Sequence, residues 1–131
     1  MADEIRKGLY RISVPLPNSP LKDLNSYVIK GKDRNLIIDT GFNRSVCYEA
    51  MRKGLAELGI DLQQTDFMLT HMHADHTGLV TRLATQTSRI FFSRIDARVF
   101  DGDHGWQSLV DFAERNGFPA EELQKALASH P

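Results

Sequence analysis

Three of the five histidines in this 131-residue sequence fall within six residues. His71, His73 and His76 stand in the segment 71–76 (His-Met-His-Ala-Asp-His), which also carries Asp75. Imidazole nitrogens and carboxylate oxygens are ligands that zinc takes in proteins. On an irregular loop the four groups can serve two adjacent ions, with the first two histidines on one ion and the Asp-His pair on the other. Two such ions hold and deprotonate a bridging water, which gives hydroxide near neutral pH.

The segment that precedes the cluster predicts how it is positioned. Residues 67–70 (Phe-Met-Leu-Thr) have the pattern of a short buried strand, and the histidines begin directly after it. Chance clustering of surface histidines is the competing interpretation, and the position behind an apolar strand weighs against it. We therefore expect the four side chains to converge on one loop at the carboxyl end of that strand.

The hydrophobic pattern of the whole chain predicts an α/β fold. Strands are expected at residues 9–14, 26–30, 35–39, 67–70 and 89–93, the second and third of which form a β-hairpin. Helices are expected from Asn43 or Ser45 to Gly59, over residues 79–84, 95–100 and 106–116, and from Pro119 towards the chain end. The first of these helices joins the strands at 35–39 and 67–70, which allows one right-handed βαβ crossover.

Composition excludes several functional classes. Sixteen Lys and Arg against seventeen Asp and Glu give a net charge of -1, which argues against a basic nucleic-acid-binding surface. The apolar runs are too short to span a bilayer, and the first fifteen residues show no signal peptide, so the cytoplasm is the expected compartment. Cys47 is the single cysteine; we expect it to be a small core residue rather than a nucleophile, because it lies among the apolar positions of the first expected helix.

The motif and its surroundings resemble a known family. Residues 70–78 (Thr-His-Met-His-Ala-Asp-His-Thr-Gly) are similar to the HxHxDH signature of the metallo-β-lactamase-fold hydrolases. Residues 25–29 and 36–41 resemble that family's hairpin and its Asp-Thr-Gly turn, and the resemblance extends from residue 9 to about residue 93. It implies the N-terminal half of an αββα sandwich, with a metal-binding βα half-domain at residues 1–93. Residues 94–131 would be a helical segment similar to a variable insertion, without a separate second domain.

The resemblance assigns roles to single residues. It implies that His71 and His73 bind a first metal, and that Asp75 and His76 bind a second metal. Asp75 is also the expected catalytic residue that orients the nucleophile. Asp39 would lie just outside the metal ligands, near the metal loop, although an ordinary turn or cap residue remains an equal alternative on the residues alone. The expected cofactor is zinc, two ions in a complete enzyme, with manganese or iron as alternatives.

One departure from the family bears on function. A complete member has a second half that supplies another histidine, a bridging aspartate and a last histidine to the two metals. His104, in a polar turn, and His130, near the chain end, are poor substitutes for them. We therefore expect an incomplete N-terminal part of a hydrolase, weakly active or inactive alone, whose small-molecule substrate is an ester, thioester, lactone, amide or phosphodiester.

Two alternatives to a hydrolase remain at this point. The chain could be a non-catalytic metal-binding or self-associating fragment, in which two copies form a homodimer or higher oligomer through the uncovered sheet face. A redox di-iron protein of related fold ranks lower. Such members generally have an acid in place of the second histidine, whereas His73 is retained here.

Overall fold

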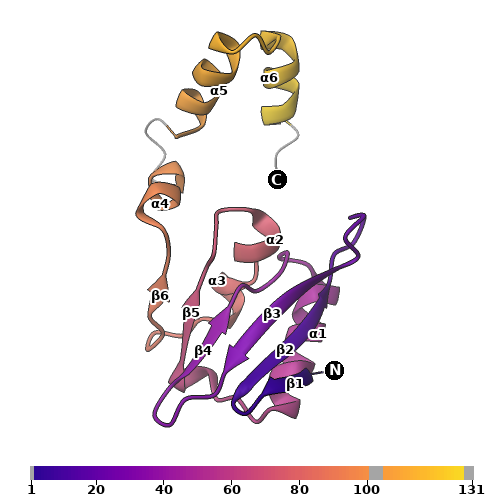
Figure 1. Cartoon of the computed structure of the whole chain (residues 1–131), viewed down its shortest axis with the longest axis vertical. Coiled ribbons are helices and arrows are strands. Elements are labelled where there is room, and N and C mark those ends of the chain that lie inside the picture. The colour runs from indigo at the N-terminus through magenta and orange to yellow at the C-terminus, as the bar shows by residue number, and fades with distance from the viewer. Residues whose placement is uncertain (1, 101–104, 129–131) are drawn as a thin grey trace. The chain divides into compact units, whose positions relative to one another are not determined.

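Main-chain hydrogen bonds join six strands into one mixed sheet in the order β1-β2-β3-β4-β5-β6 (Figure 1). The computed structural model describes residues 2–100 and 105–128. The strands are β1 (Ala2–Arg6), β2 (Leu9–Pro15), β3 (Asp23–Ile29), β4 (Asn35–Ile38), β5 (Thr65–Met68) and β6 (Ile90–Phe91). The pairings from β1 to β4 are antiparallel, whereas β4 pairs with β5, and β5 with β6, in parallel. The predicted α/β class and the predicted hairpin of β3 and β4 are confirmed.

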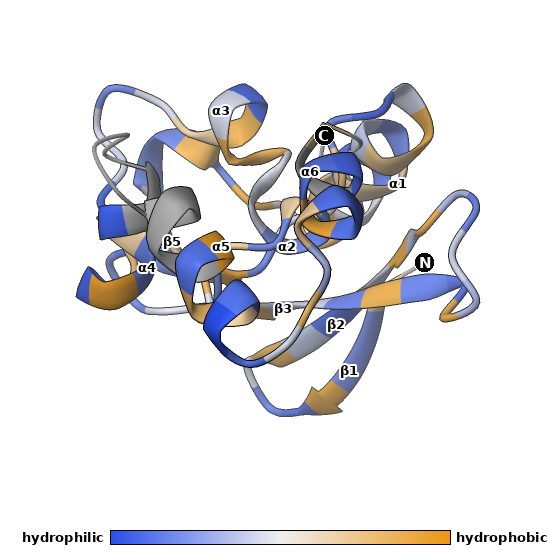
Figure 2. Cartoon of the chain, turned by 90° about the horizontal axis from the view of Figure 1, so that it is seen from above, coloured by the Kyte–Doolittle hydropathy of each residue, from blue (hydrophilic) through white to orange (hydrophobic). Residues whose placement is uncertain are grey.

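The helix α1 (Ser45–Glu57) connects β4 to β5 and covers one face of the sheet. Side chains of alternate strand positions meet it, because successive residues of a strand point to opposite faces. In Figure 2, hydrophobic and hydrophilic residues follow one another along β2 and β3. The buried core on this side comprises Ile12, Val14, Val28, Ile37 and Phe67 from the strands, Met51 and Leu55 from α1, and Leu79 and Leu83 from the segment after the histidines.

The ends of α1 differ in part from the prediction. The residue at its N-cap is Arg44, and no side chain caps the helix, so the expected cap by Asn43 or Ser45 is wrong. At the other end Gly59 has a φ of 63°, as the predicted stop requires. The ammonium group of Lys30 donates to the Leu58 carbonyl oxygen at 2.7 Å and satisfies one of the free acceptors of the last turn.

The strand β5 is shifted from its predicted position, and the strand β1 was not predicted. The strand expected at residues 67–70 lies at Thr65–Met68, preceded by the short 3-10 helix η1 (Leu62–Gln64). The edge strand β1 was not predicted, because its five residues (Ala-Asp-Glu-Ile-Arg) show little hydrophobic alternation. It pairs with β2 through main-chain hydrogen bonds, which depend little on side-chain type.

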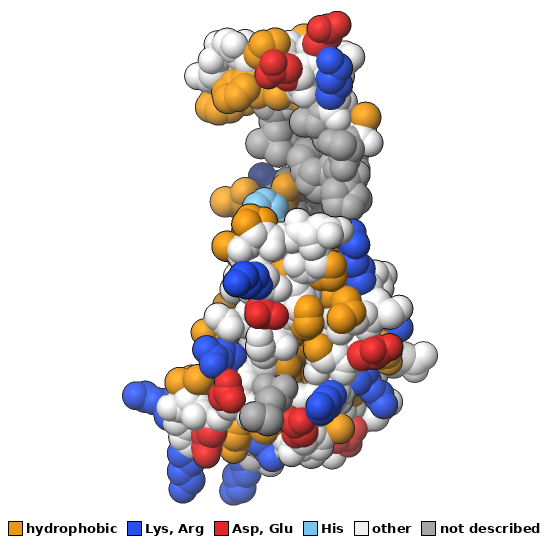
Figure 3. All heavy atoms as spheres, turned by 90° about the vertical axis from the view of Figure 1, so that its right-hand side faces the viewer, with side chains coloured by type: hydrophobic (Ala, Val, Ile, Leu, Met, Phe, Trp, Pro, Cys, Tyr) orange, Lys and Arg blue, Asp and Glu red, His pale blue; other side chains and the backbone are white. Residues whose placement is uncertain are grey.

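The chain divides into two compact units, Met1–Ser93 and Arg94–Pro131. The second unit contains α4 (Arg94–Phe100), α5 (Gly105–Arg115) and α6 (Ala120–Ala128), and Gly117 with a φ of 89° follows α5. Among the described residues, no helix is long and apolar enough to cross a membrane. On the face of the first unit that Figure 3 shows, positive and negative side chains are intermixed, in agreement with the balanced composition.

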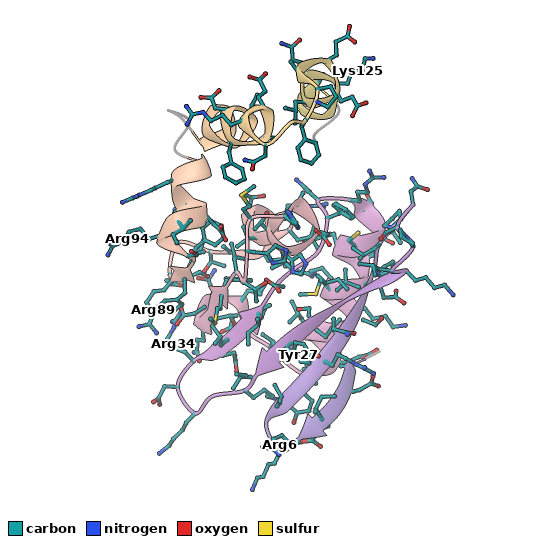
Figure 4. The ribbon with its side chains drawn as sticks, turned by 45° about the horizontal axis from the view of Figure 1, so that its top comes forward. Arg6, Tyr27, Arg34, Arg89, Arg94 and Lys125 are labelled. Carbon is teal, nitrogen blue, oxygen red and sulfur yellow. The ribbon has the colours of Figure 1, made fainter. Side chains whose placement is uncertain are left out.

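A buried carboxylate links the amino ends of the parallel strands β4, β5 and β6. Asp66 on β5 is only 4% exposed, and its carboxylate accepts hydrogen bonds from the guanidinium groups of Arg34 and Arg89 and from the amide of Arg89. Figure 4 shows the two arginines side by side. The hydrogen bonds from Arg34, and then those from Arg89, hold the pKa of Asp66 well below its usual range. Arg34 also donates to the Thr87 carbonyl oxygen at 2.9 Å. These hydrogen bonds link the turn before β4, the strand β5 and the segment before β6.

This arrangement predicts a pH-dependent contribution to stability. A carboxylate with a lowered pKa in the folded state stabilises the fold above the ordinary aspartate pKa, and this stabilisation declines as the pH falls below about 4. Replacing Asp66 by Asn should therefore lower the urea midpoint at neutral pH, and the difference from the unsubstituted chain should shrink in acid. Asp33→Asn removes an exposed carboxylate from the neighbouring turn and is the matched control. Equal effects of the two substitutions at neutral pH would contradict the role of Asp66.

Candidate metal centre

The His-Met-His-Ala-Asp-His segment leaves the carboxyl end of β5 and turns over the end of the sheet (Figure 1). His71 and His73 lie in the irregular part of this segment, whereas Asp75 and His76 lie on the one-turn helix α2 (Ala74–Thr77). His73 is the N-cap residue of α2 in extended conformation, which is the bend between the two pairs. Residues 67–78 therefore do not form one continuous helix, and the four side chains come together.

The first two histidines each present one ring nitrogen to the other. His71 Nε2 lies 3.1 Å from His73 Nδ1, and the ring centroids are 4.6 Å apart. Two nitrogens bound to one tetrahedral zinc at about 2.0–2.1 Å lie about 3.3 Å apart. The pair thus has nearly the separation and the donor chemistry that one zinc ion requires.

Asp75 and His76 form a second pair beside the first. Asp75 Oδ2 and His76 Nε2 are 3.5 Å apart, again a spacing that a single ion can bridge. The rings of His71 and His76 have centroids 4.0 Å apart, so the two pairs are neighbours. All four residues that the sequence selected thus lie close together, and the assignment of each pair to one metal ion stays a prediction.

Asp39 contacts Thr70, which precedes the first pair, and His76 of the second pair. It directly follows β4, is 5% exposed, and has a φ of 58°. Its Oδ1 accepts from the Thr70 amide at 2.9 Å, and its Oδ2 accepts from the Thr70 hydroxyl at 2.8 Å and from His76 Nδ1 at 2.8 Å. Asp39 is therefore more than a turn residue, because its carboxylate contacts the histidine segment directly. With Nδ1 of His76 engaged, Nε2 is the nitrogen left for a ligand.

The Asp-Thr-Gly turn also fixes the main chain of the histidine segment. Thr40 donates to the His76 carbonyl oxygen from its amide at 2.8 Å and from its hydroxyl at 2.9 Å. The amide of Leu79 donates to the Gly41 carbonyl oxygen at 3.0 Å. These contacts join segments about forty residues apart and hold the histidine segment against the sheet.

Within the described residues, no group of three or more His, Cys, Asp or Glu side chains has the geometry of a metal site. Each pair by itself would offer a metal ion two side-chain donors, whereas a catalytic zinc usually has three protein ligands. His104 and His130, the remaining candidates from the sequence, lie outside the described residues. Cys47 takes no part: it is buried in the core, its thiol contacts the Pro15 carbonyl oxygen at 3.1 Å, and burial raises its pKa.

One contributor was missed by the sequence reasoning. Thr70 immediately precedes His71, and its hydroxyl lies 3.0 Å from His71 Nδ1 as well as within hydrogen-bond distance of Asp39. Its place between a strand and a metal-ligand pattern was the available signal. Its partner Asp39 is 31 residues away, however, and that contact exists only because β4 and β5 are parallel neighbours.

Comparison with known proteins identifies the family of the chain. The sequence profile of the Metallo-beta-lactamase superfamily matches residues 21–90, which is more than half of the chain. The chain belongs to the metallo-beta-lactamase superfamily. The predicted family and the predicted partial metallo-β-lactamase fold are thereby confirmed.

Similar proteins of the superfamily are considerably longer. The lactamase-like protein adaB of Aspergillus niger is 31% identical over 93 residues, which are 70% of this chain and 27% of that protein. The atrochrysone carboxyl ACP thioesterase nsrC of Aspergillus novofumigatus is 37% identical over 75 residues, 54% of this chain and 23% of that protein. The chain thus spans about a quarter of the length of these curated relatives.

Solved structures give the same result for the fold. The metallo-beta-lactamase family protein TTHA1429 from Thermus thermophilus superposes with a TM-score of 0.64 at 31% identity, over 98% of this chain and 44% of that one. The class B3 di-zinc metallo-beta-lactamase LRA-12 from an Alaskan soil metagenome superposes with a TM-score of 0.61 at 24% identity, over 79% and 36% of the two chains. The second likeness supports the fold alone.

Close packing at Gly78 yields a stability prediction for the centre. A Cβ atom there would lie 2.6 Å from the Ala74 carbonyl oxygen and the Asn43 amide nitrogen, and 2.8 Å from the Gly41 carbonyl oxygen. Because all three are main-chain atoms, Gly78→Ala should lower the free energy of unfolding by about 2–3 kcal/mol, measured by urea denaturation.

Gly59→Ala is the control for that substitution. Gly59 has no atom within 4 Å of a Cβ atom, so its replacement carries only the cost of a positive φ, about 1 kcal/mol. A loss at Gly78 no greater than the loss at Gly59 would show that the turn and the histidine segment are not in close contact.

Proposed function

We propose that the protein is a metal-dependent hydrolase whose dinuclear zinc centre is held in part by His71, His73, Asp75 and His76. The observation that carries the proposal is the approach of His71 Nε2 to His73 Nδ1 at 3.1 Å, beside the 3.5 Å approach of Asp75 Oδ2 to His76 Nε2. Membership of the superfamily supports it. Imidazole and carboxylate donors also suit manganese or iron, so these metals are alternatives to zinc.

The residues of this chain have distinct tasks in such a reaction. The bound metals would supply a Lewis acid that activates water and stabilises negative charge on the substrate oxygen. Asp39 accepts the Nδ1 proton of His76 and so directs Nε2 towards the ligand position. Asp75 approaches His76 through Oδ2, and its second carboxylate oxygen is suited to accept a hydrogen bond from the nucleophilic water and orient it.

The substrate class that we propose is an ester, thioester, lactone, amide or phosphodiester. One relative is named a thioesterase of a carboxyl ACP substrate, which favours the thioester within this range. A hollow of about 290 Å³ next to the histidine segment offers room for an apolar part of the substrate. Its lining consists of Met68, Leu69, Thr70, Phe91, Phe92 and Ser93.

The second candidate function is metal binding without catalysis. It is favoured because, among the described residues, each pair offers a metal ion only two donors. A site with two protein ligands binds metal weakly and lowers the pKa of a bound water less reliably than a site with three. The 131-residue chain by itself should accordingly hydrolyse substrates slowly, even where the whole protein is an enzyme.

The two candidates are separated by zinc titration and substrate assays on the same chain. We expect zinc binding that is lost when His71 and His73 are both replaced by Ala, because the first pair then has no donor. Turnover of ester, thioester, lactone and phosphodiester substrates by the zinc-loaded chain should stay well below ~1 per second, and the double substitution should abolish it. His104→Ala and His130→Ala are the control variants and should leave zinc binding unchanged.

Each departure from these results has a defined meaning. Turnover at ~1 per second or more that vanishes in the double variant would show that further ligands complete the site. Identical turnover in the two chains would favour binding without catalysis. Failure of the unsubstituted chain to bind zinc, manganese or iron would contradict both candidates.

We also propose that the first unit associates with a second copy through its open sheet face. The register of the strands places Tyr27, Ile38, Met68 and Phe91 in one row across β3, β4, β5 and β6, on the side opposite the buried row of Val28, Ile37 and Phe67. Met68 is 44% exposed and Phe91 is 50% exposed. Apolar faces of this kind usually mark an interface.

Sedimentation velocity at micromolar concentration tests this association. We expect a dimer or a higher oligomer, and Met68→Glu should shift it towards monomer, because a charge would be buried in the contact. Leu21→Glu changes a leucine that is 73% exposed in the loop between β2 and β3 and should have no effect. A folded, purely monomeric chain under these conditions would contradict the proposal.

A further inference from the structure

The Thr70 hydroxyl stands between a carboxylate and an imidazole. Its Oγ1 lies 2.8 Å from Asp39 Oδ2 and 3.0 Å from His71 Nδ1, while the amide of the same residue donates to Asp39 Oδ1 at 2.9 Å. Asp39 is thus in contact with His71 through one intervening oxygen. The same carboxylate contacts His76 directly at 2.8 Å.

Proton counting fixes the direction of both hydrogen bonds at Oγ1. A hydroxyl has one proton, and an ionised carboxylate can only accept, so the Thr70 proton goes to Asp39. The hydroxyl oxygen then accepts from His71, which requires the proton of the neutral imidazole to be on Nδ1. Nε2 of His71 is left with its lone pair, and this is the atom that lies 3.1 Å from His73 Nδ1.

We infer that Thr70 is a positioning residue for the first histidine pair. Its hydroxyl donates to Asp39 and accepts from His71, and so fixes the His71 tautomer in which Nε2 carries no proton. We call this link from Asp39 through Thr70 to His71 the relay. The inference deepens the proposed function and rests on it in taking Nε2 as a metal donor. Asp39 would then set the tautomer of one histidine in each pair, that of His76 directly and that of His71 through Thr70. Partners of this kind typically change metal affinity by about 10–100-fold when they are removed.

The alternative is that Thr70 merely contributes to the strand end. Its side chain is exposed, so replacing it by the similarly shaped Val creates no core cavity and should leave the fold intact. Ser keeps the hydroxyl and loses only a methyl group. The pair Thr70→Val and Thr70→Ser therefore separates the hydroxyl from the shape of the side chain.

The direct readout is the histidine tautomer in metal-free protein, measured by long-range ¹H–¹⁵N NMR over a pH series and taken from the neutral form of each ring. We expect the Nδ1-protonated form of His71 in the unsubstituted chain and in Thr70→Ser, and a shift towards the Nε2-protonated form in Thr70→Val. His76, which bonds Asp39 directly, should keep its tautomer in all three chains and serves as an internal control. An unchanged His71 tautomer in Thr70→Val would overturn the inference.

Zinc affinity gives the second readout. Thr70→Val should weaken binding at the first pair by about tenfold, and Thr70→Ser should restore it. Thr81→Val, an exposed threonine on α3 (Val80–Leu83), is the matched control and should have no effect. Equal zinc affinity of Thr70→Val and the unsubstituted chain would count against the relay.

The two readouts distinguish this inference from the proposed function. A tautomer shift in Thr70→Val without zinc binding by any of the chains would support the relay and contradict the metal centre. Zinc binding that depends on His71 and His73, together with an unchanged tautomer, would support the centre and overturn the relay.

Discussion

The carboxylate of Asp39 is the interaction on which the arrangement of the candidate centre depends. A buried carboxylate is costly unless hydrogen bonds satisfy it, and here the amide and hydroxyl of Thr70 and the Nδ1 atom of His76 do so. Thr70 directly precedes the histidine segment, and His76 ends it. The same contacts that satisfy the carboxylate therefore also hold the histidine segment in position.

The sheet topology makes this contact available. The strands β1 to β4 pair antiparallel to one another, and the chain then crosses over through α1, so that β5 runs parallel to β4. The carboxyl ends of two parallel neighbours meet at the same edge of a sheet, which is where ligand sites form in α/β proteins. Asp39 follows one of these strands and Thr70 follows the other. At the amino ends of the same strands, Asp66 and its two arginines link β5 to the residues before β4 and β6. One end of the parallel strands therefore carries the candidate centre, and the other carries this ion-pair network.

Local pattern was enough to predict some of this structure. The β3–β4 hairpin, α1 and the grouping of the four ligand candidates follow from alternation, helical spacing and the density of histidines in one segment. The strand β1 could not be predicted in the same way, since its polar residues are held by main-chain pairing. The bare N-terminus of α1 at Arg44 was also missed, because a sequence shows which residues can cap a helix but not whether they do. The link from Asp39 through Thr70 to His71 depends on tertiary contact between segments 31 residues apart.

The central claim is that Asp39 holds the histidine segment in place before any metal binds, and amide hydrogen exchange of the metal-free chain tests it most directly. The account predicts that the Thr70 amide is protected in the unsubstituted chain and exchanges about tenfold faster or more in Asp39→Ala, since a hydrogen bond to a charged group contributes about 1.5–3 kcal/mol. The amides of β2 and β3 should be unaffected, and Asp75→Ala, which removes a carboxylate from the same segment, should leave the protection of Thr70 unchanged. Equally fast exchange of Thr70 in the unsubstituted chain and in Asp39→Ala would contradict the account.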